Sequence, residues 1–209
     1  MPSPPPLQMG HYYHIFNRGN NGEDIFREKR NYLFFMQRYA QYIEPIAYTY
    51  AYCLLRNHFH FLVRTRTPEE QEAYQKTLKT LKVSETFRVL QPSRQFSKLF
   101  NSYAKAFNKM YDRTGSLFEH PFHRIEVDAD TYFSRLVAYI HQNPQKHAFV
   151  SDFRDWPFSS YQAILSRRAT RVQRDSITEW FGGLEGFVEF HATRVAPQCI
   201  EATLLDEDL

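Results

Sequence analysis

Two short apolar strands are predicted in residues 47–63, which read AYTYAYCLLRNHFHFLV. Successive side chains of a strand point to opposite faces, so His58 and His60 project from the same face. Two imidazoles on one face can bind the same ligand, and a metal ion is the first candidate for that ligand. The same spacing also fits two hydrogen-bonded histidines on a half-exposed strand, so the rest of the sequence has to distinguish these alternatives.

The length and composition of the chain suit one globular domain with appendages. Of its 209 residues, 43% are hydrophobic and 17% are aromatic, which is enough for a sizeable core. The two cysteines, Cys53 and Cys199, give neither a disulfide framework nor a cysteine metal cluster. The first residues, MPSPPP, lack the basic and apolar regions of a signal peptide, and no apolar run has the length of a membrane span. We therefore expect a soluble cytoplasmic protein in a reducing compartment, without a membrane partner.

Positive charge is concentrated in the part of the chain that carries the histidine pair. Residues 151–209 hold 6 Lys/Arg against 10 Asp/Glu, which leaves 20 against 13 for residues 1–150. Basic residues interleaved with aromatic residues between positions 94 and 135 are typical of contact with a phosphate backbone. On charge alone, an ordinary solvated surface explains the pattern equally well. The acidic residues 206–208 are interpreted as a solvated tail.

Apolar spacing predicts an order of elements in which strands and helices are mixed. Short tyrosine-rich apolar runs predict strands, and apolar residues three and four apart predict helices. A proline disfavours the helical conformation in the residue before it, so the last helix of the main domain is expected to end at Asn143, before Pro144. The predicted strands are residues 12–16, 46–55, 59–63 and 125–127, and the predicted helices are 25–42, 69–81, 94–111 and one that begins at Asp128 or Asp130.

Tyr139 and Asn143 lie on that last helix one turn apart, beside its apolar stripe. A phenolate oxygen could attack a phosphodiester while a carboxamide oxygen joins two imidazoles around a divalent ion. The spacing permits this chemistry without requiring it. Because the chain has 14 tyrosines, any one of them is first expected to be a partly buried packing residue.

Five segments between residues 12 and 161 carry a recognisable pattern. They are YHIFNRG (13–19), NHFHFLV (57–63), FNKMYDRTGSLFE (107–119), YIHQNP (139–144) and DWPFSSY (155–161). In this order they resemble the single-tyrosine HUH transposases, and most closely their REP-associated tyrosine transposase branch. Agreement of all five segments by chance is improbable.

The resemblance implies a fold and a division of the chain. The fold is of the mixed α/β (α+β) class, a ferredoxin-like antiparallel sheet with helices packed on one face. The catalytic domain would comprise residues 1–165, with a charged excursion at 67–92. Residues 166–209 carry little of the family pattern, and their own sequence predicts a C-terminal extension, helical with an acidic tail.

The resemblance also implies an activity, which is metal-dependent cleavage and strand transfer of single-stranded DNA at hairpin-bearing, REP-like sequences. His58 and His60 match the metal pair, Asn143 matches a third ligand, and Tyr139 matches the nucleophile, with Mg²⁺ or Mn²⁺ as the cofactor. Attack by Tyr139 would leave a 5′-phosphotyrosine and a free 3′-hydroxyl, and the reverse attack would reseal the strand without ATP. The protein would act as a monomer or a homodimer in the bacterial cytoplasm, associated with the nucleoid.

Contacts with the DNA are predicted from residue type. For each aromatic residue named below, packing in the core is at least as good an explanation as base stacking. For each cation, simple exposure to solvent is as good an explanation as a phosphate contact. Stacking on bases is assigned to Tyr12, Tyr13, Phe16 and Phe118, and contact with phosphates to Arg18, Arg56, Lys105, Lys109, Arg113 and Arg124.

The chain departs from the family pattern at two places. Arg56 precedes Asn57 where a proline is usual, and His120-Pro121 follows Glu119 where a glycine and a basic residue are common. His120 and His123 could be additional ligands, although surface histidines are the simpler interpretation. Tyr103 is the second candidate nucleophile, and its place on an apolar stripe favours core packing.

Three functions therefore compete. The first is a DNA nickase and strand transferase, which predicts a covalent adduct that needs Tyr139. The second is a domesticated, non-catalytic protein that binds DNA hairpins, and the third is a metal-dependent phosphoesterase that uses water as its nucleophile. Retention of the histidine pair, Tyr139 and Asn143 favours the first, and the basic bias disfavours the third.

Overall fold

A four-stranded antiparallel sheet forms the centre of the computed structural model, which describes residues 5–78, 87–128 and 130–193. The strand order is β2-β3-β1-β4. This is the order of a ferredoxin-like sheet, and the predicted fold class is confirmed. The strands are β1 (Tyr12–Arg18), β2 (Ala47–Leu54), β3 (His58–Thr65) and β4 (His123–Glu126).

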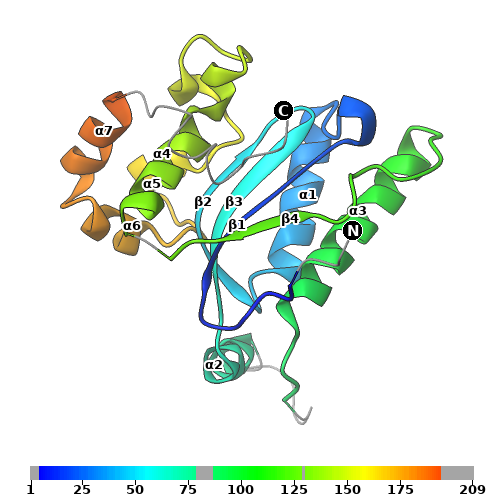
Figure 1. The fold of residues 1–209 in the computed structure, drawn as a ribbon, viewed down its shortest axis with the longest axis horizontal. Helices are drawn as coiled ribbons and strands as arrows, with labels where there is room; N and C mark the ends of the chain where they lie inside the picture. The colour runs from blue at the N-terminus through cyan, green and yellow to red at the C-terminus, as the bar shows by residue number, and fades with distance from the viewer. Residues whose placement is uncertain (1–4, 79–86, 129, 194–209) are drawn as a thin grey trace.

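Helices lie on both sides of this sheet (Figure 1). The helices are not confined to one face as predicted: α1 and α3 lie on one side, and α4 covers the opposite side, with the short helices that follow it beside α4. Two 3-10 turns, at Asn20–Gly22 and Phe153–Asp155, complete the described elements. The helices are α1 (Lys29–Tyr42), α2 (Pro68–Leu78), α3 (Pro92–Met110), α4 (Asp130–Lys146), α5 (Tyr161–Leu165), α6 (Arg174–Trp180) and α7 (Leu184–Ala192).

The core between the sheet and the helices α1 and α3 is predominantly aromatic. Phe59 and Phe61 of β3 point to this side, where their ring centroids lie 5.3 and 6.2 Å from that of Phe35 in α1. Tyr103 of α3 packs edge-on against Phe35 at 5.0 Å. Aromatic pairs at these separations add to the free energy gained by burying apolar area. The packing fixes which face of β3 is turned toward α1 and α3.

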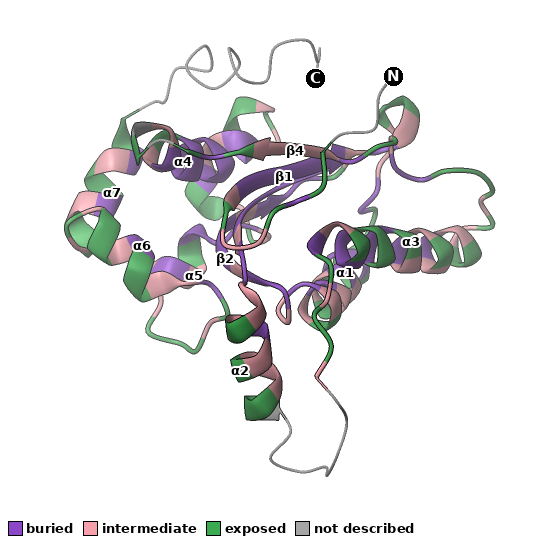
Figure 2. Ribbon diagram, turned by 60° about the horizontal axis from the view of Figure 1, so that its bottom comes forward, coloured by how far each residue is buried: buried purple, intermediate pink, exposed green. Residues whose placement is uncertain are grey.

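The other face of the sheet packs against α4. Leu62 of β3 and Cys53 of β2 belong to a second core with Leu136, Val137 and Ile140 of α4. Figure 2 shows the buried side of α4 turned toward the strands. Because β3 alternates, this is also the face that receives His58 and His60.

The end of α4 differs from the prediction, which placed it at Asn143. The helix continues through Pro144 to Lys146. Proline removes a single backbone donor, and the His147 N–H donates to the Asn143 carbonyl at 3.0 Å, which closes the final turn. The Asn143 amide also donates to the Tyr139 carbonyl at 2.9 Å, which holds the residue before the proline in the helix.

The chain after α4 covers the outer edge of β2. The Leu54 and Ser160 N–H groups donate to the Phe158 and Tyr52 carbonyls at 2.9 Å each, and the Gln173 N–H donates to the Thr49 carbonyl at 2.8 Å. An uncovered edge strand would present these groups to another chain. Here the protein pairs them with its own residues.

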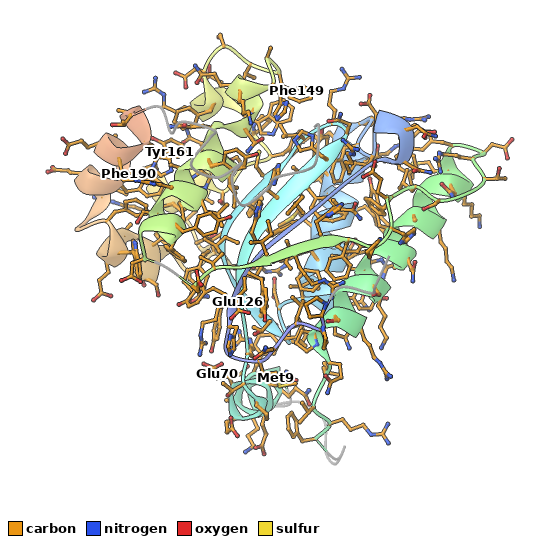
Figure 3. The ribbon with its side chains drawn as sticks, in the orientation of Figure 1. Met9, Glu70, Glu126, Phe149, Tyr161 and Phe190 are labelled. Atoms are coloured by element: carbon orange, nitrogen blue, oxygen red, sulfur yellow. The ribbon has the colours of Figure 1, made fainter. Side chains whose placement is uncertain are left out.

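The helices α6 and α7 attach to α4, so the first part of the predicted extension is helical. The ring of Tyr161 packs between α4 and α7, with its centroid 5.7 Å from that of His141 and 5.5 Å from that of Phe187 (Figure 3). His141 Nδ1 and His191 Nε2 are 2.8 Å apart. The acidic residues 206–208 and part of the charged excursion lie outside the described residues, and the division at residue 165 stays a prediction.

Within the described part of the chain, none of the helices combines the length and apolar character needed to cross a bilayer.

The buried His141–His191 contact predicts a loss of stability in mild acid. Burial lowers the pKa of His191 to about 4, partly opposed by its hydrogen bond to the Phe187 carbonyl, and burial lowers the pKa of His141 well below its ordinary value. The unfolded chain takes up these protons near pH 6.5 and the folded chain does not. Stability is therefore complete above about pH 6.5 and falls below it, by about 1.4 kcal/mol per pH unit for each such group. For His191 the fall ends near pH 4.

The variant His191→Leu tests this assignment by urea unfolding at several pH values. It is expected to lose about 1–3 kcal/mol at pH 8, because the partner nitrogen of His141 is left buried and unpaired. Between pH 6.5 and 5 the stability of the variant should fall less steeply with pH than that of the wild type. The difference between the two slopes should be about 1.4 kcal/mol per pH unit. Parallel curves for the two proteins over this range would show that His191 does not carry the effect.

Candidate active site on the histidine face of the sheet

His58 and His60, called the histidine pair below, lie side by side on β3 as the alternation predicted. Their ring centroids are 5.2 Å apart and the rings are nearly perpendicular, at 86°. Both side chains are buried, with exposed fractions of 4% and 1%. They are therefore not the half-exposed histidines of the alternative interpretation.

A third histidine joins the pair from the neighbouring strand. His14 of β1 is fully buried, and its Nε2 lies 3.0 Å from Nδ1 of His60. Antiparallel pairing sets Phe16 opposite His60 and His14 opposite Leu62, which brings the two imidazoles together diagonally. In the sequence, His14 stands within the segment 13–19 that resembles the family, and no role was predicted for it. The two-residue spacing of His14 and Phe16 predicts that both lie on the same face of the sheet, but it does not predict which residue His14 contacts.

Tyr139 reaches the same place from α4. Its ring centroid lies 5.7 Å from that of His60 and 6.5 Å from that of His14, edge-on to both. The side chain is 4% exposed, and the Lys146 ammonium lies 5.1 Å from the ring centroid. The predicted nucleophile and the histidine pair thus meet within one chain.

Asn143 follows one turn after Tyr139 and is completely buried. Its Oδ1 has no hydrogen-bond partner within the protein, and neither has Nε2 of His58 or Nε2 of His60. Leaving a buried polar atom unpaired costs about 1–3 kcal/mol. Three such atoms on adjacent elements form the kind of donor set that a cation would satisfy.

The histidines are neutral in this environment, as metal ligands have to be. Burial lowers the pKa of His58 to about 3, with His147 adding to the effect and the nearby Asn143 side chain opposing it. Burial likewise lowers the pKa of His14 to about 3. The pKa of His60 is well below its ordinary value because of burial and its histidine neighbours.

Within the described residues, no group of three or more His, Cys, Asp or Glu side chains is placed to hold a metal ion. A cation at the histidine pair would therefore need a ligand of another kind. The amide oxygen of Asn143 is such a ligand.

Because α4 is longer than predicted, it brings two more residues close to the site. The His147 ring centroid lies 4.8 Å from that of His58, and Lys146 lies over Tyr139. Neither residue was predicted, because the helix was expected to end at Asn143. Continuing the period of 3.6 residues past the proline would have placed Lys146 two turns after Tyr139.

The six predicted phosphate-binding cations are dispersed over the structure. Arg18 lines a narrow pocket beside the histidine pair, together with Phe16, Asn17 and His123, and it pairs with Glu119 at 2.6 Å. Arg56 and Arg113 form ion pairs with Asp24 and Glu23 at 2.6 and 2.7 Å. Lys105 and Lys109 are exposed on α3, on the other side of the sheet, and Arg124 of β4 reaches Ser93 of α3.

Three further candidates occupy different positions relative to the histidine pair. The Tyr103 hydroxyl donates to the Ile25 carbonyl at 2.5 Å inside the α1 and α3 core, so the second candidate nucleophile is a packing residue. His123 stacks on Phe16 with ring centroids 4.9 Å apart and lines the pocket, whereas His120 is exposed.

Comparison with known proteins gives one relative in sequence and one in structure. No protein-family model matches the chain. A protein of Haemophilus influenzae named as a REP-associated tyrosine transposase is 29% identical over 128 residues, which cover 61% of this chain and 66% of the relative, just under two thirds of its length.

The structural relative is a REP-associated tyrosine transposase solved bound to a REP hairpin. It superposes with a TM-score of 0.53 at 17% sequence identity, covering 80% of this chain and 86% of that one. At this identity the match shows the shared fold. The name of the sequence relative confirms the predicted resemblance of this chain to the REP-associated tyrosine transposase branch, and the structural match shows the shared fold.

Proposed function

We propose that this protein cleaves and rejoins single-stranded DNA at hairpin-bearing sequences, with Tyr139 as the nucleophile. The observation that carries the proposal is the position of Tyr139, whose ring lies 5.7 Å from that of His60 beside three buried nitrogen and oxygen atoms that have no hydrogen-bond partner. The names of the two relatives support the substrate class, since one of them is solved with a REP hairpin.

The residues present fit a divalent cation, Mg²⁺ or Mn²⁺. Nε2 of His58, Nε2 of His60 and Oδ1 of Asn143 would hold it, because each is a buried nitrogen or oxygen with no hydrogen-bond partner inside the protein. When bound, such an ion polarises a phosphate oxygen and stabilises the charge that develops during attack.

The residues of the chain itself would carry the exchange of phosphodiester bonds. The Tyr139 oxygen gives up its proton and forms a bond to the 5′ phosphorus, the bond from that phosphorus to the 3′ oxygen breaks, and the 3′ oxygen takes up a proton and leaves as a hydroxyl. The Lys146 ammonium lies 5.1 Å from the Tyr139 ring centroid and places a positive charge beside the attacking residue. Attack of a 3′-hydroxyl on the phosphotyrosine reverses these steps and needs no external energy.

A non-catalytic hairpin-binding protein is the second candidate. The observation in its favour is the 4% exposure of Tyr139, which leaves the phenol little open surface. It predicts salt-sensitive binding of hairpin DNA without any covalent adduct.

The variant Tyr139→Phe separates the two functions. Purified protein is incubated with hairpin-bearing single-stranded oligonucleotides that bind it and with Mn²⁺, and the products are run on a denaturing gel. The wild type should give a protein band that carries covalently attached DNA. Tyr139→Phe should give no such band and should still bind the DNA as before, because only the attacking oxygen is removed.

Tyr103→Phe is the matched control, since it removes the hydroxyl of the buried tyrosine on the opposite side of the sheet. It should keep the adduct. An adduct that persists in Tyr139→Phe excludes this residue as the nucleophile, and a wild type that binds but forms no adduct supports the second candidate.

The proposed cation ligands predict a loss of metal binding in Asn143→Leu, which has a side chain of similar size without the amide oxygen. Mn²⁺ affinity measured by electron paramagnetic resonance should fall by about tenfold or more, a value typical of a weakened metal site. Gln142→Leu on the same helix is the control and should bind Mn²⁺ like the wild type. Equal affinities for all three proteins would remove Asn143 from the ligand set.

A further inference from the structure

Each imidazole of the histidine pair has one nitrogen engaged and the other free. Nδ1 of His58 lies 2.8 Å from Oδ1 of Asn57, and Nδ1 of His60 lies 3.0 Å from Nε2 of His14. The two Nε2 atoms are buried and have no partner within the protein. The same nitrogen is therefore left free on both rings.

A neutral imidazole carries its single proton on the nitrogen that donates a hydrogen bond. The amide oxygen of Asn57 can only accept, so Nδ1 of His58 carries the proton and its Nε2 presents a lone pair. At His60 the partner is another imidazole, and either ring could donate. If His14 donated, the proton of His60 would sit on Nε2 and point an N–H group at any cation.

We propose that His14 is a positioning residue whose Nε2 accepts a hydrogen bond from Nδ1 of His60 and thereby holds His60 in the tautomer that can bind a divalent cation. The part that concerns the cation rests on the proposed function. The hydrogen bond itself is a property of the metal-free protein.

The surroundings of His14 hold its ring in one orientation, and its Nδ1 is buried without a hydrogen-bond partner. Its ring is fully buried and stacks on Phe16, with centroids 4.7 Å apart at 30°, and on His60, at 5.1 Å and 23°. Edge contact with Tyr139 restrains it from the side of α4. A ring enclosed in this way cannot turn its Nε2 away from His60 without repacking the site. The partner that orients a metal-binding histidine typically changes metal affinity by about 10–100-fold when it is removed.

The tautomers can be measured directly in the metal-free wild type by long-range ¹H–¹⁵N NMR of histidine side chains near pH 7. The expected result is protonated Nδ1 and bare Nε2 on His60, with protonated Nδ1 on His14. A His60 protonated on Nε2 overturns the proposal. This measurement needs no variant and no metal.

Two substitutions then test the role of His14. His14→Phe keeps an aromatic ring and removes the acceptor, whereas His14→Gln offers an amide oxygen as a replacement acceptor. In His14→Phe the proton of His60 should no longer be confined to Nδ1, and Mn²⁺ affinity should fall by about 10–100-fold. His14→Gln should retain the wild-type tautomer and most of the affinity.

His191→Leu is the control, since it removes a buried histidine from the far side of α4. It should change neither the tautomer of His60 nor Mn²⁺ affinity. If His14→Phe leaves both unchanged, His14 has no positioning role. If the tautomers behave as expected but the wild type binds no Mn²⁺, the assignment to His14 stands and the proposed metal-dependent function is wrong.

Discussion

The two-residue alternation of β3 is the constraint on which the rest of the structure depends. It turns Phe59 and Phe61 toward α1 and α3, and it turns His58 and His60 toward α4. A slip of one residue in the pairing would exchange the two sets and bury imidazoles among phenylalanines. The aromatic core therefore holds the register that keeps both histidines on one face. Packing energy on one side of the sheet determines the chemistry on the other.

Burial of the histidine face has an electrostatic consequence. The helix α4 excludes water from His58, His60 and Asn143, so the imidazoles stay neutral and their free acceptor atoms remain unpaired. Unpaired buried groups destabilise a fold, and a chain selected for stability alone would replace them with apolar residues. Their retention at one place, beside Tyr139, is the strongest physical argument for a ligand there.

Local periodicity was sufficient to predict the elements and the pairs that lie within one element. His58 with His60 follows from the strand repeat, and Tyr139 with Asn143 follows from the helix repeat. Contacts that depend on pairing between distant segments could not be predicted from the sequence. The approach of His14 to His60 requires the register of β1 against β3, which no local pattern states. The predicted end of α4 at Asn143 was wrong. A proline disfavours the helical conformation in the residue before it, but here the hydrogen bond from the Asn143 amide to the Tyr139 carbonyl holds that residue in the helix.

Charge was the least informative signal, because composition does not tell on which side of a sheet a side chain lies. Of the six proposed cations, Arg18 lines the pocket beside the histidine pair, while Lys105, Lys109 and Arg124 are on or reach toward α3.

The connections of α4 decide which part moves in the proposed reaction. The helix follows β4 directly, and the segment after it is hydrogen-bonded along the edge of β2. Both ends of α4 are thus tied to the sheet that carries the histidine pair. The contacts of α7 with His141 hold the same helix from its outer side. A tyrosine anchored in this way changes its distance from His60 only if the packing of α4 against the sheet is broken. In the proposed reaction the DNA strand, and not the tyrosine, has to travel between cleavage and rejoining.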